Sequence, residues 1–153
     1  MRWTSIIGFK QAVVWDKGGL GMGWHYRRSY EFMLVAQKKG GACNWQGGNA
    51  ESNVVRIPKI IPAADQHPCE KPVALMQHFI RLHSHPGELV LEPYLGRGAT
   101  LVAAYRSGRA AIGCDIDERW AEASARRLEA ELAQGRLFEP AEVAQPRQEV
   151  IAL

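Results

Sequence analysis

The pattern of apolar and polar residues predicts two strands in the first quarter of the chain. Residues 12–15 (Ala-Val-Val-Trp) form a β-prone run that ends at the glycine-containing turn of residues 16–19. Residues 30–36 (Tyr-Glu-Phe-Met-Leu-Val-Ala) form a second such run, which ends at residues 38–41. From 40 to 66 the chain is rich in Gly, Asn, Pro and Ser and has little periodicity. We therefore expect a long connection without regular structure there.

The second half of the chain is more regular and predicts a βαβ unit between two further helices. A first helix starts at Pro72, because proline is accepted in the first helical turn, and its apolar residues recur at helical spacing up to Leu82. The elements predicted after it are a buried strand at 88–91, a glycine turn at 96–98, a helix at 99–107, a buried strand at 110–114 and a helix at 118–134. A helix between two neighbouring strands predicts that the strands are parallel.

The last of these helices has an apolar face and two end signals. The apolar residues that share this face are Ala121, Ala125, Leu128 and Leu132. Glu122 and Arg126 have the i,i+4 spacing of an ion pair, and Gly135 is placed to end the helix.

Length and composition predict that the chain forms one domain with its own core. It has 153 residues, 46% of them apolar, and no apolar run approaches the roughly 18 residues that span a membrane. No signal-peptide core follows Met1, so we expect a cytoplasmic protein with no membrane partner. Cys43, Cys69 and Cys114 are too far apart for a zinc site or a disulfide framework, and we expect Cys69 and Cys114 to be small buried residues.

Charge is distributed unevenly and makes the first half the better candidate for contact with a polyanion. The net charge is +3, but residues 1–72 carry ten Lys and Arg against five Asp and Glu. The segment between the first two strands contains Trp24, Tyr26, Arg27 and Arg28. These residue types can stack on bases and bind phosphates, although a solvated loop with one or two packed aromatic residues has the same composition.

One glycine turn and one acidic residue suggest a nucleoside site. Asp115 follows the second strand of the βαβ unit and lies 19 residues after Gly96, which is the spacing expected when an acid accepts hydrogen bonds from ribose hydroxyls. Leu101 stands where a dinucleotide fingerprint needs its third glycine, so a nicotinamide cofactor is disfavoured. A simple strand-to-helix turn is the alternative.

Three motifs, in a fixed order along the chain, indicate which kind of nucleoside-binding protein the sequence resembles. Residues 67–72 (His-Pro-Cys-Glu-Lys-Pro), 92–100 (Glu-Pro-Tyr-Leu-Gly-Arg-Gly-Ala-Thr) and 113–117 (Gly-Cys-Asp-Ile-Asp) resemble motifs of the DNA amino-methyltransferases, in the order of their permuted β class. Upstream, residues 14–18 and 26–32 resemble the last two sheet strands of that family. The resemblance covers the later part of the family and implies a Rossmann-like α/β methyltransferase fold with an incomplete sheet. It also implies S-adenosylmethionine as cofactor and transfer of a methyl group to adenine N6 or cytosine N4 of double-stranded DNA.

The resemblance also assigns roles by position. Around the methionine half of the cofactor it places Glu92, Tyr94, Gly96 and Gly98, and at the ribose it places Asp115. On the opposite wall it places Cys69, Glu70 and Lys71. The implied cofactor-binding residues are Cys69, Glu70, Lys71, Glu92, Tyr94, Gly96, Gly98, Thr100, Asp115 and Asp117. The implied DNA-binding residues are Trp24, Tyr26, Arg27 and Arg28. Glu92 replaces the usual Asp, and Arg97 and Ala99 replace small hydroxyl residues, which lowers the expected affinity.

The catalytic tetrapeptide of the family, Asp/Asn/Ser-Pro-Pro-Tyr/Phe, has no counterpart, because none of the eight prolines is adjacent to another. No catalytic residue is therefore assigned, and we expect the chain alone to be inactive. Three hypotheses follow: an enzyme whose partner chain supplies this segment, a non-catalytic remnant that binds cofactor or DNA, or, with less support, a nicotinamide-dependent oxidoreductase. An unpaired edge on strand 88–91 also favours a homodimer, rearranged strand pairing or aggregation.

Several other residues have plainer interpretations. His83 and His85 follow an apolar helix and precede Pro86, so we expect a helix end and no metal site. Trp15, Tyr94 and Trp120 are expected in the core, with Tyr94 the best candidate for a cofactor contact. The expected single domain divides into a hairpin (1–38), a loop or target-recognition region (39–66), a cofactor-binding βαβ region (67–135) and a tail (136–153).

Overall fold

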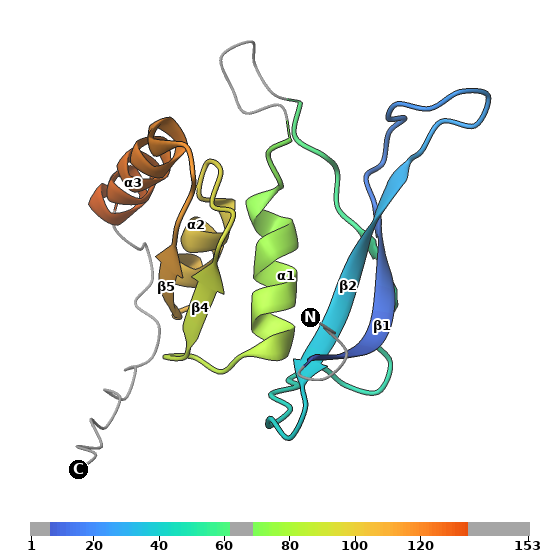
Figure 1. The fold of residues 1–153 in the computed structure, drawn as a ribbon, viewed down its shortest axis with the longest axis horizontal. Coiled ribbons are helices and arrows are strands. Elements are labelled where there is room, and N and C mark those ends of the chain that lie inside the picture. Colours follow the sequence, from blue (N-terminus) through green and yellow to red (C-terminus); the bar gives the residue numbers. More distant parts are fainter. Residues whose placement is uncertain (1–6, 62–68, 135–153) are drawn as a thin grey trace.

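The computed structural model describes residues 7–61 and 69–134, which form an α/β fold with helices packed on two separate sheets (Figure 1). The strands are β1 (Ile7–Asp16), β2 (Tyr30–Lys38), β3 (Val54–Arg56), β4 (Leu89–Glu92) and β5 (Ala110–Gly113). The helices are α1 (Val73–His83), α2 (Ala99–Arg106) and α3 (Glu118–Ala133). Among the residues described, no helix is both long and apolar enough to cross a membrane.

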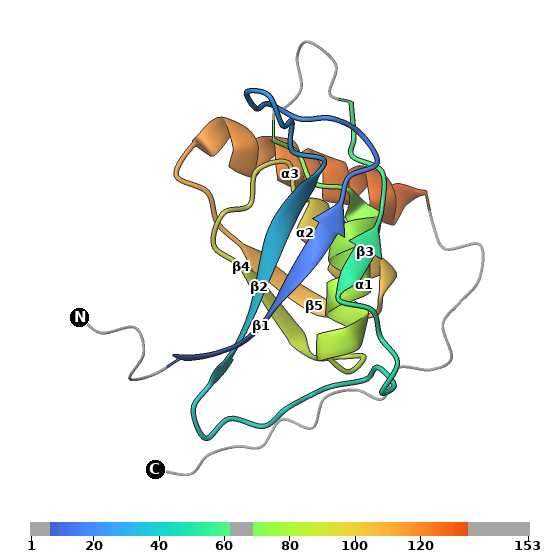
Figure 2. The ribbon, with the colours of Figure 1, turned by 90° about the vertical axis from the view of Figure 1, so that its right-hand side faces the viewer.

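The first sheet has the order β2-β1-β3. β1 and β2 form an antiparallel hairpin (Figure 2). The strand register shifts between Phe9 and Gln11 at a bulge. The two strands predicted from the pattern are confirmed. Both strands are longer than their apolar runs, because the polar residues at their ends also form backbone hydrogen bonds between the strands. The expectation of an irregular connection over 40–66 is wrong at β3, which pairs in parallel with β1. Three residues are too short a run to show periodicity.

Helix α1 lies between the two sheets in Figure 1 and packs against both. Pro72 caps its start in an extended conformation, and Ser84 follows its end, so the helix predicted from Pro72 is confirmed. On one side, Leu75 packs with Trp15 of β1. On the other, Ile80 packs with Ala103 and Ala104 of α2. Burying apolar side chains on two sides of one helix is what holds the two sheets together.

The predicted βαβ unit is present as β4, α2 and β5. β4 and β5 pair in parallel, with Leu89 opposite Ala110 and Glu92 opposite Gly113. The turn between β4 and α2 contains Gly98, which caps α2 with φ at +72°. At Gly98 an added Cβ would also lie 2.7 Å from Cβ of Ser124, a buried residue of α3. Glycine at this position therefore permits both the backbone turn and the close approach of α3.

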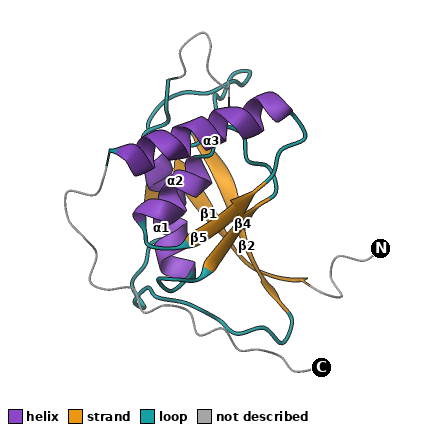
Figure 3. Ribbon diagram, turned by 90° about the vertical axis from the view of Figure 1, so that its left-hand side faces the viewer, coloured by secondary structure: helices purple, strands orange, loops and turns teal. Residues whose placement is uncertain are grey.

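The prediction that these two strands are buried is wrong for one of their faces. Along both strands exposed residues alternate with half-buried ones. Val90 and Ala111 pack on the cluster formed with α1 and α2, whereas Leu89, Leu91 and Ile112 are exposed. Helices cover only one side of this sheet (Figure 3). A short apolar run does not reveal whether both faces of its strand are covered.

Helix α3 begins at Glu118, and the side chain of its N-cap residue Asp117 accepts a hydrogen bond from the Arg119 N–H. The predicted pair is confirmed, with Arg126 Nη1 3.2 Å from Glu122 Oε2. The predicted apolar face is only partly correct, because Ala125 and Leu132 are exposed and Ser124 is the buried residue. The small Ser124 side chain fits against Gly98, where a larger apolar residue would not. The proposed cap Gly135 lies outside the described residues.

Candidate functional site

A cavity of about 270 Å³ lies where the ends of β4 and β5 meet the segment before α1. Eight of the ten predicted cofactor-binding residues line it: Cys69, Glu70, Lys71, Glu92, Tyr94, Gly96, Thr100 and Asp115. Residues that the motifs did not assign to the cofactor complete the lining: Met76, Leu95, Arg97 and Ala99. Gly98 and Asp117 do not line this cavity, and each is the N-cap of a helix.

Glu92 ends β4 and organises the turn that follows. Its Oε1 accepts a hydrogen bond from the Tyr94 N–H at 3.0 Å, and its Oε2 accepts one from the Thr100 hydroxyl at 2.9 Å. Thr100 lies in the first turn of α2, so the carboxylate joins strand, turn and helix. A carboxylate has about four lone-pair directions, which leaves acceptor capacity on the cavity side for a cationic group.

Asp115 follows β5 and reaches back to the glycine turn across the site. Its Oδ2 accepts from the Gly96 N–H at 2.8 Å, and its Oδ1 accepts from the Asp117 N–H at 3.0 Å. Gly96 has φ at +51°, and nothing lies within 4 Å of a Cβ built on it. The turn backbone therefore faces open space beside a fixed carboxylate, which is an arrangement suited to a ligand with hydroxyl groups.

Glu70 fixes the opposite wall through two arginines. Its side chain is nearly buried, with Arg127 Nη1 of α3 2.7 Å from Oε1 and Arg97 Nη1 3.7 Å from Oε2. Arg127 also donates to the Arg97 carbonyl oxygen at 3.0 Å. Sequence reasoning missed Arg127, because it lies 57 residues from Glu70 and within no motif. Glu70 thus positions the wall, and its carboxylate is already occupied by charged partners.

Lys71 connects the cavity to the hairpin sheet. Its Nζ lies 2.7 Å from Glu31 Oε2 on β2 and 5.3 Å from the centre of the Trp15 ring. Partial burial opposes ionisation of Glu31, but hydrogen bonds and charge attraction from Lys71 and Lys17 outweigh it and hold the pKa of Glu31 below its usual value. Glu31 was also missed from sequence, where it is an ordinary polar residue in a strand.

The aromatic residues and cysteines differ in part from expectation. Trp15 is in the core, as predicted, with 2% of its surface exposed. The expectation of a core position is wrong for Tyr94, which is 88% exposed at the cavity because the glycine turn lifts it away from the strand. Trp120 is half-buried. Cys69 and Cys114 are exposed, not buried, because they lie in turns beyond the packed elements.

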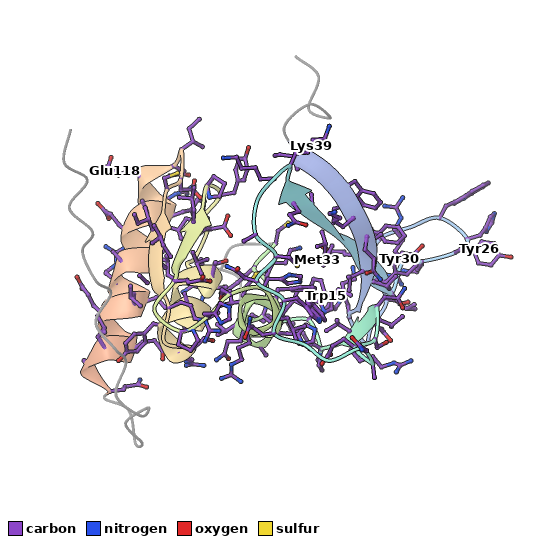
Figure 4. All side chains as sticks on the ribbon, turned by 90° about the horizontal axis from the view of Figure 1, so that it is seen from below. Trp15, Tyr26, Tyr30, Met33, Lys39 and Glu118 are labelled. Atoms are coloured by element: carbon purple, nitrogen blue, oxygen red, sulfur yellow. The ribbon has the colours of Figure 1, made fainter. Side chains whose placement is uncertain are left out.

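The loop between β1 and β2 carries the predicted DNA-binding residues at the far end of the hairpin (Figure 4). Trp24 and Tyr26 are almost fully exposed, so neither is a packed aromatic residue of the core. Arg27 Nε donates to the Gly21 carbonyl oxygen at 2.8 Å, and the Gly21 N–H donates to the Arg28 carbonyl oxygen at 2.7 Å. Arg28 also lines a hollow of about 670 Å³ at the base of the loop. The loop is internally bonded while its rings face outward.

The histidines near the end of α1 form a helix end, as predicted. Ser84 follows His83, and its hydroxyl donates to the Ile80 carbonyl oxygen. Burial, followed by the nearby His78, lowers the pKa of His83, whose ring also lies 5.2 Å from that of Trp45. Within 7–61 and 69–134 no group of three His, Cys, Asp or Glu residues could hold a metal ion.

Comparison with known proteins identifies the family. The model of a family described as DNA methylase, which groups N6 and N4 enzymes, matches residues 41–126. The chain belongs to the DNA amino-methyltransferase family. The DNA adenine methyltransferase YhdJ of Escherichia coli (strain K12) is 35% identical over 158 aligned positions, which cover 82% of this chain and 54% of YhdJ. The resemblance inferred from the three motifs is confirmed at the level of this family.

Solved structures confirm the methyltransferase fold. The complex of M1.HpyAVI with S-adenosylmethionine matches with a TM-score of 0.68 and 26% identity, covering 80% of this chain and 63% of M1.HpyAVI. The cytosine-N4-specific PvuII DNA methyltransferase matches with a TM-score of 0.65 and 16% identity, over 84% of this chain and 56% of that one. This family member therefore spans between about half and two-thirds of the length of these three relatives.

Proposed function

We propose that this chain is the S-adenosylmethionine-binding module of a DNA methyltransferase that modifies adenine N6 or cytosine N4. The observation that carries the proposal is the cavity in which eight residues assigned from the motifs come together from separate segments. Family membership supports methyl transfer over hydride transfer to a nicotinamide. The module corresponds to residues 67–135 of the proposed division, with the hairpin at 1–38 and the segment 39–66 available for DNA.

The residues present fit this cofactor. S-adenosylmethionine has an ammonium group, a sulfonium cation, ribose hydroxyls and an adenine ring, and it supplies the methyl group when bound. Glu92 offers a carboxylate to the ammonium. Asp115, which also accepts from the Gly96 N–H, offers one to the ribose hydroxyls. The exposed Tyr94 ring and the apolar Met76 and Leu95 supply further contact surface.

Each carboxylate is oriented before a ligand arrives. Glu92 is fixed by two hydrogen bonds from the turn and α2, and Asp115 by two backbone N–H groups. Acceptors held in place lose little side-chain entropy on binding, so more of their interaction energy contributes to affinity. Glu70 contributes differently, since its contacts with Arg127 and Arg97 hold the wall in position.

We propose that DNA is contacted by the loop between β1 and β2. Trp24 and Tyr26 present exposed rings that can stack on bases, and Arg27 and Arg28 place two cations beside them. The hydrogen bond from Arg27 Nε leaves its two terminal nitrogens for phosphate oxygens. The bonds within the loop reduce the ordering cost of binding double-stranded DNA.

Methyl transfer requires a second contribution that these residues do not supply. The target amino nitrogen must be held in line with the transferring methyl group, which is chiefly a matter of positioning. No Pro-Pro dipeptide occurs in the 153 residues, and we assign no catalytic residue. We propose that this segment is supplied from outside these 153 residues, as another part of the same enzyme or as a partner chain.

The proposed function is tested by titrating the purified chain with S-adenosylmethionine and, in parallel, with NAD. Binding of the first without the second is the expected result. Binding of NAD alone would contradict the proposal. The alternative of a non-catalytic remnant is distinguished by adding the missing segment from a relative, because a remnant would bind cofactor yet transfer no methyl group even then.

A further inference from the structure

One arginine side chain of the cavity wall takes part in an ion pair but in no hydrogen bond. Arg97 lies in the glycine turn between β4 and α2 and lines the candidate cofactor cavity. Its Nη1 is 3.7 Å from Glu70 Oε2, which is too far for a hydrogen bond. No oxygen of the described residues accepts a hydrogen bond from its guanidinium group. A guanidinium has five N–H donors, so Arg97 has donors available to a ligand.

Glu70 has its closest contact with a different arginine. Arg127 Nη1 donates to Glu70 Oε1 at 2.7 Å and to the Arg97 carbonyl oxygen at 3.0 Å. One nearly buried carboxylate thus faces two guanidinium groups, and the three side chains together have one negative and two positive charges. This excess of positive charge beside the cavity favours a negatively charged group of a ligand.

Lys71 is the other basic residue in the cavity lining, and it is already hydrogen-bonded. Its Nζ donates to Glu31 Oε2 on β2 at 2.7 Å. A ligand anion would have to compete with this carboxylate for Lys71, whereas no hydrogen bond has to be broken at Arg97. Arg97 is therefore the more suitable partner for an anionic group in the cavity.

The same turn also presents an acidic residue that has only uncharged partners. Glu92 accepts hydrogen bonds from the Tyr94 N–H and the Thr100 hydroxyl, and within the described part of the chain it forms no ion pair. Glu92 and Arg97 both line the cavity. One carboxylate and one guanidinium at a single turn match a ligand group that has an ammonium and a carboxylate on the same carbon atom.

From these observations we propose that Arg97 binds the carboxylate of the cofactor's methionine half, while Glu92 binds the ammonium. The inference rests on the proposed function and names Arg97 as the residue that makes the site specific for an α-amino acid group. A guanidinium suits a carboxylate because two parallel N–H groups can reach both oxygens. The sequence predicts the opposite effect of Arg97, namely a lower affinity than with a small hydroxyl residue at this position.

Decarboxylated S-adenosylmethionine is the probe that tests this contact. It lacks the carboxylate but keeps the ammonium, the sulfonium, the ribose and the adenine ring. Both ligands are titrated by calorimetry into the full chain as wild type, Arg97→Gln and Arg97→Lys. Arg126→Gln is the matched control, because it also removes a guanidinium from an ion pair but lies outside the cavity lining. Circular dichroism melting verifies that all variants are folded.

We expect Arg97→Gln to bind S-adenosylmethionine at least about tenfold more weakly than the wild type, because it loses hydrogen bonds between charged groups. Its affinity for the decarboxylated ligand should not fall, since that ligand has no carboxylate to lose. Arg97→Lys should weaken S-adenosylmethionine binding less than Arg97→Gln, because lysine keeps the charge but not the paired donors. Arg126→Gln should match the wild type with both ligands.

Two results would overturn the inference while leaving the proposed function in place. Equal weakening of both ligands in Arg97→Gln would show that Arg97 acts through Glu70 on the shape of the cavity. Unchanged affinity for S-adenosylmethionine would exclude the contact, and a lower salt dependence of duplex binding in the same variant would then assign the guanidinium to phosphates. A wild type that binds neither ligand would instead overturn the proposed function and this inference together.

Discussion

Lys71 and Glu31 form an ion pair, with Nζ and Oε2 2.7 Å apart, that connects the wall of the candidate cofactor cavity to β2 of the hairpin. The two residues are 40 positions apart in sequence. Lys17 Nζ lies 3.3 Å from Oε1 of the same carboxylate, so Glu31 is shared between two lysines. The candidate cofactor cavity and the hairpin that carries the proposed DNA-binding loop thus have a direct electrostatic connection.

This relationship predicts a pH dependence. The pKa of Glu31 is lower in the folded chain than in the unfolded chain, so its ionised form stabilises the fold at neutral pH. That contribution is present above the unfolded pKa, near 4.5, and is lost as pH falls through the lower folded pKa. Glu31→Gln should reduce the free energy of unfolding at pH 7 by under about 1 kcal/mol, since the pair is partly exposed to solvent.

Urea unfolding of the wild type and Glu31→Gln at several pH values tests this. The difference between them should shrink as pH falls below about 4.5, where the wild-type carboxylate is progressively protonated. Glu129→Gln, an exposed acidic residue of α3, is the control and should change little at any pH. A difference that stays constant down to strongly acidic pH would show that Glu31 acts through packing alone.

A second prediction concerns the contact between α3 and the glycine turn. Gly98→Ala adds a Cβ 2.7 Å from Ser124 Cβ at a position with positive φ, whereas Gly108→Ala has positive φ but nothing within 4 Å. Gly108→Ala should cost about 1 to 2 kcal/mol for the backbone alone. Gly98→Ala should cost at least about 1 kcal/mol more, because overpacking adds to the strain. Equal midpoints of denaturation for the two variants would contradict this account of the packing.

The hairpin loop gives a prediction for DNA binding. Replacing Arg27 and Arg28 with alanine should reduce the slope of log affinity against log salt by about two units, since each phosphate contact contributes roughly 0.9. Trp24→Ala should weaken binding by about 1 to 3 kcal/mol without changing that slope, because stacking releases no counterions. Fluorescence anisotropy with a duplex at several salt concentrations measures both. An unchanged slope in the double arginine variant would rule out phosphate contacts there.

Methylation by the chain alone should be undetectable. Positioning can account for about 7 to 11 kcal/mol of a transfer barrier, and no residue of this chain is assigned to hold the target amino group. The assay incubates the purified chain with labelled S-adenosylmethionine and unmethylated genomic DNA, with and without a segment that carries the catalytic tetrapeptide of the family. Label on the DNA in the absence of that segment would show that other residues hold the base, for which Tyr94 would be the first to examine.

Sequence patterns were most informative where chemistry and local structure coincide. The motif residues Glu92, Gly96 and Asp115 were correctly placed on a strand end, a glycine turn and the next strand end, because each step depends on neighbours in sequence. Periodicity likewise located α1 and α3 to within a residue or two.

What the sequence did not predict depends on long-range contacts. Arg127 and Glu31 contact the residues of the cavity wall from 57 and 40 residues away in sequence, and no motif assigned a role to either. β3 exists only because β1 offers an edge to three residues. The exposed side of Leu91 could not be predicted either, since an apolar run has the same pattern whether one or both faces are covered.

The measurement that tests the central claim most directly is calorimetric titration of S-adenosylmethionine into the wild type, Asp115→Asn and Glu129→Gln. Both substitutions remove one negative charge with little change in shape, but only Asp115 lines the cavity. Losing a charged acceptor costs about 1.5 to 3 kcal/mol, so Asp115→Asn should bind at least about tenfold more weakly. Glu129→Gln should match the wild type. Equal affinity of Asp115→Asn and the wild type, or no binding by either, would contradict the assignment of this cavity to the cofactor.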